Sequence, residues 1–247
     1  MRIVIVFLGI LASEILSAQN YTYLRAELGL TTTKLHIIEN YSLIDNTLFE
    51  GGGAMYGFYL RREISEMLSF EIGYSYRMYS DQIGLISNYY ASTGGIESHQ
   101  IPFKLNLNID VFKDRISMFA SFGYLFCIEE SNGGGSSSTL NSDGKSILLE
   151  WKFIPESKFN SLLSTSTGCR FRVYDQLLLE MELGYIFGFK NLIEYNVTYW
   201  DDSGVLQALN SKGKGEYYYF KLGLSYPIQR VQELLAMLKL PGTNNNK

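Results

Sequence analysis

The sequence lacks three features that would point to common classes of function. It has no excess of basic charge, since 21 Lys and Arg stand against 25 Asp and Glu and the formal net charge is −4, which leaves no electrostatic footprint for nucleic acid. After Ala18 it has no continuous apolar run of helix length, which argues against a bundle of membrane-spanning helices. It also has no glycine motif that cradles phosphate, because the triplet 51–53 opens a predicted strand and the triplet 133–135 lies in a polar loop.

Histidine and cysteine are scarce, with two of each, so few catalytic or metal-binding sets can form. Ser98 stands beside His99, but adjacent strand residues point to opposite faces, which spoils a direct hydrogen bond. His36 lies in a long loop, and the acidic pair Asp201 and Asp202 matches no dedicated calcium loop. We therefore predict no catalytic, cofactor-binding or metal-binding residues.

One apolar run does occur, at the start of the chain. Residues 1–18 combine a basic residue, Arg2, with the run IVIVFLGILA and a small-residue region that ends at Ala18, a pattern typical of a secretory signal peptide. An N-terminal membrane anchor is the alternative, but the run is short and Glu14 interrupts its end. No cysteine lies near the predicted cut, which argues against a lipid-anchored protein.

From residue 19 onward, apolar and polar side chains alternate with a period of two, which predicts strands. In the segment 101–111, for example, Ile101, Phe103 and Leu105 share one face, while Lys104 and Asn106 lie on the other. The alternation predicts eight long strands, an even number as single-chain bacterial barrels have: Tyr21–Thr32, Gly53–Arg61, Leu68–Ser80, His99–Phe112, Ile116–Ile128, Ser161–Tyr174, Leu177–Lys190 and Glu216–Ile228.

The connections between these strands alternate between short and long. The second, fourth and sixth are short, and the first, third, fifth and seventh are long. This asymmetry is typical of bacterial outer-membrane barrels, with short turns and both termini on the periplasmic side. We predict an all-β protein, an eight-stranded antiparallel up-and-down transmembrane β-barrel with short periplasmic turns and long extracellular loops.

Two segments need separate comment. The stretch SNGGGSSSTLNSDGKS has the composition of a flexible loop, disordered at its tip. Ile147–Phe153, in the same connection, has the pattern of a strand, and we assign it to a projection above the membrane because counting it would make the barrel odd-numbered. The predicted units are thus the signal peptide 1–18, the barrel 19–228 and a periplasmic tail 229–247, which is either a short amphipathic helix or a frayed end.

The two faces of the strands differ in charge. The apolar faces carry no charge across their middle, as expected where they meet lipid, and aromatic residues such as Tyr56, Phe126 and Tyr218 gather at strand ends as a girdle. A soluble barrel, with these faces lining a ligand cavity, is the alternative. The opposite faces combine Gly and Ser with charges: Arg25, Glu27, Arg61, Glu71, Arg77, Lys104, Asp110, Arg170, Arg172, Glu180, Glu182, Lys190 and Lys221.

An eight-stranded barrel is only wide enough for its interior to be filled by side chains, so these charges must pair. The tight corner at 174–176 sets Arg170 opposite Glu180, with Arg172 diagonal to it. We predict a set of charges that braces the lumen: Arg170, Arg172, Glu180, Glu182, Arg25, Glu27, Lys104 and Lys221. Cys127 and Cys169 fall near opposite ends of neighbouring strands and should be unpaired.

The chain resembles the small outer-membrane β-barrel domain family, a porin-like group that includes PorT-like proteins and the OmpX and OmpA transmembrane type. The resemblance is carried by the signal peptide, the strand LSFEIGYSYR and the strand start HQIPFKLNLNI, with Ile101, Pro102 and Lys104 in place. It implies the barrel and a bacterial outer-membrane location, and transfers no activity and no site residues. The tail after Ile228 departs from family barrels, which often end at or near the last strand.

The predicted function is a structural or interaction role, with outer-membrane lipid and lipopolysaccharide around the barrel and an envelope protein or surface ligand on the loops. The alternative, which the PorT-like resemblance suggests, is an accessory component of a secretion or envelope-assembly machine. A lipid A hydrolase or acyltransferase comes third, since enzymes of this kind occur on barrels of this size.

Overall fold

The computed structural model describes residues 21–34, 36–37, 50–80, 82–85, 89–92, 95–112, 115–130, 134–140, 146–154, 158–174, 176–200 and 205–228. The predicted signal peptide, the predicted tail and the acidic pair Asp201 and Asp202 lie outside these ranges. Within them, no helix combines the length and the hydrophobicity of a membrane-spanning segment.

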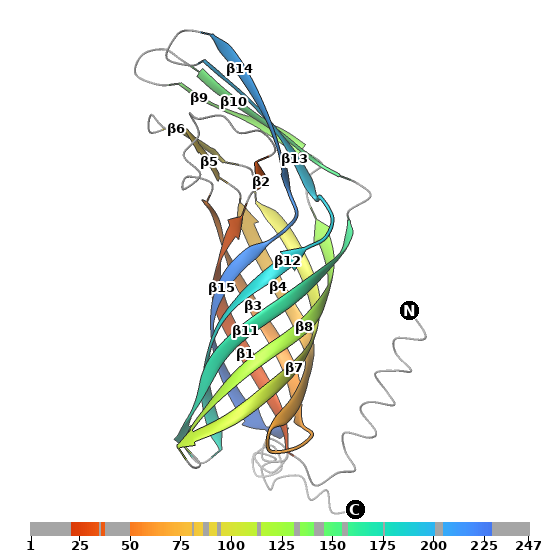
Figure 1. Cartoon of the computed structure of the whole chain (residues 1–247), viewed down its shortest axis with the longest axis vertical. Coiled ribbons are helices and arrows are strands. Elements are labelled where there is room, and N and C mark those ends of the chain that lie inside the picture. Colours follow the sequence, from red (N-terminus) through yellow and green to blue (C-terminus); the bar gives the residue numbers. More distant parts are fainter. Residues whose placement is uncertain are drawn as a thin grey trace, which may run out of the picture.

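Eight long antiparallel strands form a closed barrel (Figure 1). Around the barrel the order is β1-β15-β12-β11-β8-β7-β4-β3, so chain neighbours lie side by side and the last strand closes on the first. The up-and-down topology predicted from the sequence is confirmed. The strands are β1 (Thr22–Lys34), β3 (Glu50–Glu63), β4 (Leu68–Ser80), β7 (Ile96–Phe112), β8 (Ile116–Glu130), β11 (Phe159–Tyr174), β12 (Leu177–Gly188) and β15 (Tyr217–Pro227).

Several strands are longer than a bilayer crossing of about 9–11 residues requires. β7 has 17 residues and begins at Ile96 rather than at the predicted His99, and β11 has 16. β12 ends at Gly188, before the predicted Lys190. The start of β1 and the end of β15 lie at the same end of the barrel as the short turns after β3, β7 and β11; we call this the turn end and the opposite end the loop end (Figure 1).

A second sheet extends from the loop end (Figure 1). Its strand order is β2-β14-β13-β10-β9, and a separate hairpin joins β5 to β6. The segment Ile147–Phe153 forms most of β10 and stays outside the barrel, as expected. The long connection after β12 is itself largely the hairpin of β13 and β14. These elements are β2 (His36–Ile37), β5 (Gln82–Leu85), β6 (Tyr89–Ser92), β9 (Gly134–Leu140), β10 (Ser146–Phe153), β13 (Ile193–Trp200) and β14 (Leu206–Gly213).

The prediction of a flexible Gly/Ser-rich loop is wrong for residues 134–140, which form β9 along β10. Gly135 lies opposite Trp151, and a Cβ on this glycine would stand 2.5 Å from the indole ring. The indole therefore covers the glycine and supplies the cross-strand packing that a side chain on β9 would otherwise give. The composition of residues 134–140 predicts how this segment behaves in isolation, whereas its pairing with β10 orders it as a strand.

Side chains of the barrel strands alternate between inside and outside. Along β7, Ile101, Phe103 and Leu105 are exposed on the outer face, and the neighbouring Lys104 and Asn106 are buried inside. The same alternation runs through β8 and β15. The charged and serine-rich faces thus fill the barrel interior, and the apolar faces form its outer wall.

Candidate functional site

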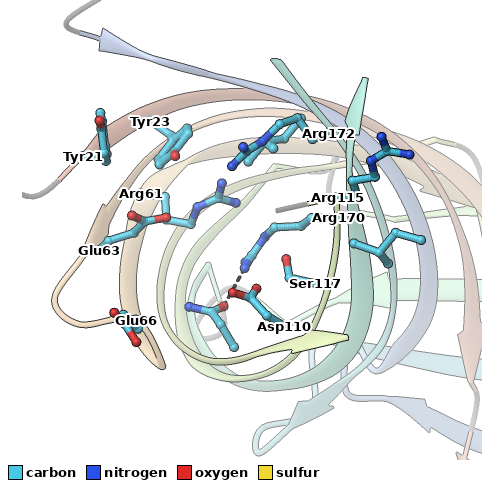
Figure 2. Close-up of a pocket in the computed structure, with 13 residues that line it drawn as sticks. Tyr21, Tyr23, Arg61, Glu63, Glu66, Asp110, Arg115, Ser117, Arg170 and Arg172 are labelled. Atoms are coloured by element: carbon cyan, nitrogen blue, oxygen red, sulfur yellow. Dashed lines mark hydrogen bonds between the residues drawn. The ribbon is translucent and has the colours of Figure 1, made fainter. Parts of the chain in front are cut away.

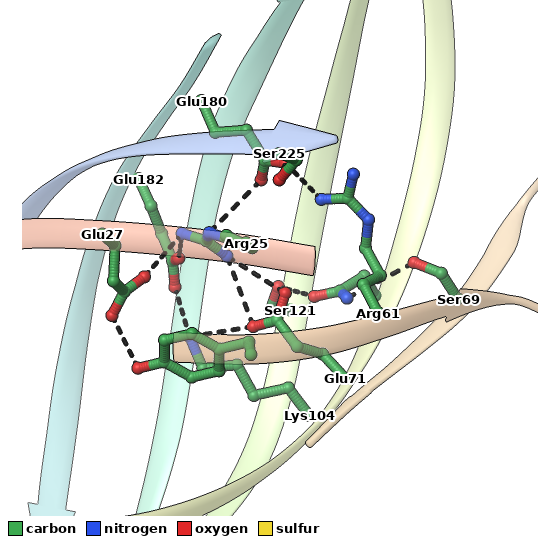
Figure 3. Close-up of polar contacts among 12 residues, drawn as sticks. Arg25, Glu27, Arg61, Ser69, Glu71, Lys104, Ser121, Glu180, Glu182 and Ser225 are labelled. Carbon is green, nitrogen blue, oxygen red and sulfur yellow. Dashed lines mark hydrogen bonds and ion pairs between the residues drawn. The ribbon is translucent and has the colours of Figure 1, made fainter. Parts of the chain in front are cut away.

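The interior of the barrel holds a buried network of charges centred on Arg25 (Figure 3). The Arg25 guanidinium lies 2.7 Å from the carboxylate of Glu182 and 2.8 Å from that of Glu27. It also lies 3.1 Å from Glu71 and 3.6 Å from Glu180. One arginine of β1 therefore contacts four carboxylates, which come from β1 itself, β4 and β12, and its exposed fraction is 2%.

Two lysines and two tyrosines extend this network. Lys104 Nζ lies 2.8 Å from Glu182, and Lys221 Nζ lies 2.7 Å from Glu27. The Tyr219 hydroxyl donates to Glu182 at 2.7 Å, and the Tyr59 hydroxyl to Glu27 at 2.6 Å. Because hydrogen bonds to an ionised carboxylate are stronger than neutral ones, they offset part of the cost of burying these charges.

On the turn-end side of this network, the carboxylate of Glu180 contacts two further arginines, Arg61 and Arg170. Arg170, its neighbour in register, donates from Nε to Oε2 at 3.3 Å. Arg61 and Ser225 both donate to the Oε1 atom of the same carboxylate. Arg170 thus lies opposite Glu180, in the register that the tight corner at 174–176 predicts.

Seven of the eight residues proposed to brace the lumen take part in these contacts: Arg25, Glu27, Lys104, Arg170, Glu180, Glu182 and Lys221. The eighth, Arg172, is exposed and lies at the turn end, next to a register irregularity in β11, where the lumen opens. Asp110 and Lys190, which share the parity of the interior, are exposed too, near the end of β7 and just beyond β12.

Sequence reasoning missed the two tyrosines at the centre of the network. Tyr59 and Tyr219 are buried, at 1% and 3% exposure. They share strand parity with Arg61 and Lys221, so the period of two places them inside. The aromatic residues assigned to the girdle, such as Tyr56 and Tyr218, have the opposite parity and lie on the outer face.

Toward the loop end, an apolar layer follows the charged one. The buried cluster here consists of Met55, Leu125, Cys127, Leu162, Ile186, Tyr217 and Tyr219. Beside Met55, its neighbour in register, the Arg77 guanidinium lies over the rings of Tyr79 and Tyr217, at 3.5 and 3.8 Å from their centroids. Side chains therefore fill the described barrel at two levels. Cys127 and Cys169 are both free thiols.

The residues considered for catalysis do not converge. Ser98 is buried inside the barrel and donates to Glu129 at 3.1 Å, whereas the adjacent His99 lies on the outer face, where Nδ1 is 2.7 Å from the Tyr74 hydroxyl. Among the described residues, no group of three or more His, Cys, Asp or Glu could hold a metal ion. The side chain of His36 lies outside the described part of the chain.

A pocket opens where the lumen meets solvent at the turn end, and we call it the mouth pocket (Figure 2). Its volume is about 250 Å³. Arg61 and Arg170 form part of its floor and link it to the charged network. The lining residues are Tyr21, Tyr23, Arg61, Glu63, Glu66, Asn108, Asp110, Arg115, Ile116, Ser117, Arg170, Arg172 and Leu178.

Comparison with known proteins gave matches among solved structures alone, since no family model and no curated protein matches the sequence. Neisserial surface protein A is similar with a TM-score of 0.45 and 11% identity, over 83% of this chain and 95% of that one. The outer membrane protein OprG from Pseudomonas aeruginosa gives 0.45 and 9%, over 83% and 96%. A major outer membrane protein from Thermus thermophilus gives 0.43 and 12%, over 83% and 99%.

Proposed function

We propose that the chain is an integral protein of a bacterial outer membrane, with a filled lumen and an interaction surface at its loop end. The band of exposed apolar side chains around the closed barrel carries this proposal. It includes Leu28, Phe58, Leu107, Phe122, Leu183 and Leu224, each more than half exposed. A water-soluble protein rarely exposes so large a continuous apolar surface, whereas a lipid bilayer covers it without cost.

The orientation follows from the asymmetry of the connections. Outer-membrane barrels have short turns on the periplasmic side and longer loops outside. We therefore place the turn end in the periplasm and the second sheet outside the cell. This sheet presents a polar face that includes Glu150, Lys152, Asn196 and Lys212, and a surface polysaccharide or a neighbouring envelope protein would meet it there.

The filled interior disfavours a diffusion pore, and the separation of Ser98 from His99 disfavours a hydrolase built on that pair. The accessory role in secretion or envelope assembly depends on residues 229–247, which lie outside the described residues. The interaction role is therefore the function that the described geometry supports best.

The membrane location is tested by fractionating expressing cells and running the outer membranes on SDS gels with and without boiling. A barrel resists SDS until heated, because its strands form a closed ring of hydrogen bonds with no free edge. We expect the protein in the outer-membrane fraction, with a band that shifts on boiling. A periplasmic protein without a shift would mean that the apolar band does not face lipid.

A lysine on the outer wall tests the same point energetically. Phe122, in the middle of β8, is 63% exposed. We expect Phe122→Lys to lower the free energy of unfolding by about 2–4 kcal/mol, as lysine does on a lipid-facing midplane. The measurement is urea unfolding in phospholipid vesicles. The control Ala208→Lys, at an exposed site in the second sheet, should change stability by less than about 0.5 kcal/mol. Equal effects at both sites would argue against lipid contact at Phe122.

A further inference from the structure

The mouth pocket contains a buried cation with an unused hydrogen-bond donor. Arg170 is 6% exposed, donates from Nη1 to Asn108 Oδ1 at 2.5 Å and contacts Glu180 through Nε. Its Nη2 is buried and has no hydrogen-bond partner among the described residues. A buried donor without an acceptor is costly, and a small shift of the Arg170 side chain toward the pocket would let an oxyanion give this atom a charge-assisted hydrogen bond.

The neighbouring charges on the floor do not neutralise Arg170. It shares the carboxylate of Glu180 with Arg61, and this carboxylate also lies 3.6 Å from Arg25. Figure 2 shows that Arg61 and Arg170 both point toward the centre of the pocket. Arg25 is balanced by its contacts with Glu27, Glu71 and Glu182. Arg61 and Arg170, in contrast, share the single carboxylate of Glu180, which leaves positive charge at the floor of the pocket.

The rim of the pocket carries charges of both signs, and Asp110, beside Ser117 in Figure 2, lies apart from the other two carboxylates. Glu63 and Glu66, from the end of β3 and the turn that follows it, lie on one side of the pocket in Figure 2. Arg115 directly precedes β8 and Arg172 lies near the end of β11, and the Arg172 backbone N–H donates to the Arg115 carbonyl at 2.9 Å. In total the lining contains four arginines and three carboxylates. A simple anion would meet repulsion from the acidic side, whereas a zwitterion would find a partner for each charge.

We propose that the mouth pocket binds a zwitterionic phosphate ligand, namely a phosphoethanolamine group. Its phosphate oxygens accept hydrogen bonds from Arg170, Arg115 and Arg172, since the planar guanidinium fork matches the geometry of phosphate. Its ammonium group lies against Glu63 and Glu66. The same chemistry occurs in free phosphoethanolamine and in a phospholipid headgroup.

The test is calorimetric titration of the full-length folded protein in detergent, with O-phosphoethanolamine as the probe. We expect saturable binding, and the double variant Arg115→Gln/Arg172→Gln should bind about tenfold more weakly or worse, because it loses charged donors to phosphate. Glu63→Gln should weaken phosphoethanolamine binding and leave inorganic phosphate binding unchanged or tighter. Lys152→Gln, which removes an exposed charge from the second sheet, should change neither.

Each variant is first checked for the heat-shifted band, so that loss of the barrel is distinguished from loss of the site. No saturable heat, unchanged affinity in the double variant, or inorganic phosphate binding as tightly as phosphoethanolamine would each overturn the proposal. Titration with dihexanoyl phosphatidylethanolamine then separates the two sources. Tighter binding than the free headgroup supports a membrane lipid, and weaker binding supports a soluble ligand.

Discussion

Replacing Arg25 with methionine is expected to lower the free energy of unfolding of the barrel by about 3–5 kcal/mol, the cost typical of breaking a buried ion pair by removing one partner. The physical reason is that Arg25 contacts the carboxylates of Glu27, Glu71, Glu180 and Glu182, and the variant leaves these groups buried with less positive charge. The measurement is urea unfolding in phospholipid vesicles, followed as the folded fraction on unboiled gels.

The matched control is Arg172→Met. Arg172 has the parity of the interior and was expected in the same network, but it is exposed at the turn end, so its loss should cost less than about 0.5 kcal/mol. Lys104→Met should fall between the two, because Glu182 keeps Arg25, Ser166 and Tyr219 as partners. If Arg25→Met lowered the free energy of unfolding as little as Arg172→Met, the charges would fill the lumen without stabilising it.

The period of two in the sequence predicted which side chains face inward, but only part of their pairing. Arg170 and Glu180 are neighbours in register on adjacent strands, and a tight corner determines that register. Arg25 and Glu182, in contrast, come from strands that β15 separates, and they meet across the interior. Contacts of this kind depend on the shape of the closed barrel, which no local pattern in the sequence specifies.

The second sheet marks another limit of sequence reasoning. β10 has a visible strand pattern, but of its two partners only β9 comes from the same connection, and β13 comes from the connection after β12. The Gly/Ser-rich β9 is ordered through its backbone ladder with β10 and through the Trp151 ring over Gly135, and neither contact is visible from its composition. The mouth pocket was likewise not predicted as a site. It joins residues from several strands and two turns. Of these residues, Arg61, Asp110, Arg170 and Arg172 were predicted to lie on the charged faces of the strands.

The charged layer also depends on glycines that make room for Tyr59. A Cβ on Gly73 would stand 2.5 Å from the Tyr59 ring and closer still to the Phe58 carbonyl oxygen, and one on Gly57 would stand 2.7 Å from the ring. The ring cannot move freely, because it is buried and its hydroxyl donates to Glu27 at 2.6 Å. The absence of side chains at these two positions thus allows a large aromatic side chain to reach a carboxylate across a narrow interior.

Gly73→Ala is therefore expected to destabilise the barrel by about 3 kcal/mol, from overpacking and from the strained hydrogen bond between Tyr59 and Glu27. Gly52→Ala is the control: its added Cβ would meet the Thr31 carbonyl oxygen at 3.7 Å, an ordinary contact, so stability should stay within about 0.5 kcal/mol. If the ring is the obstacle, Gly73→Ala should cost much less in a Tyr59→Leu background, which a double-mutant cycle measures directly. Additive effects of the two substitutions would place the strain at the Phe58 carbonyl oxygen of β3, and Tyr59 would then have no special relation to Gly73.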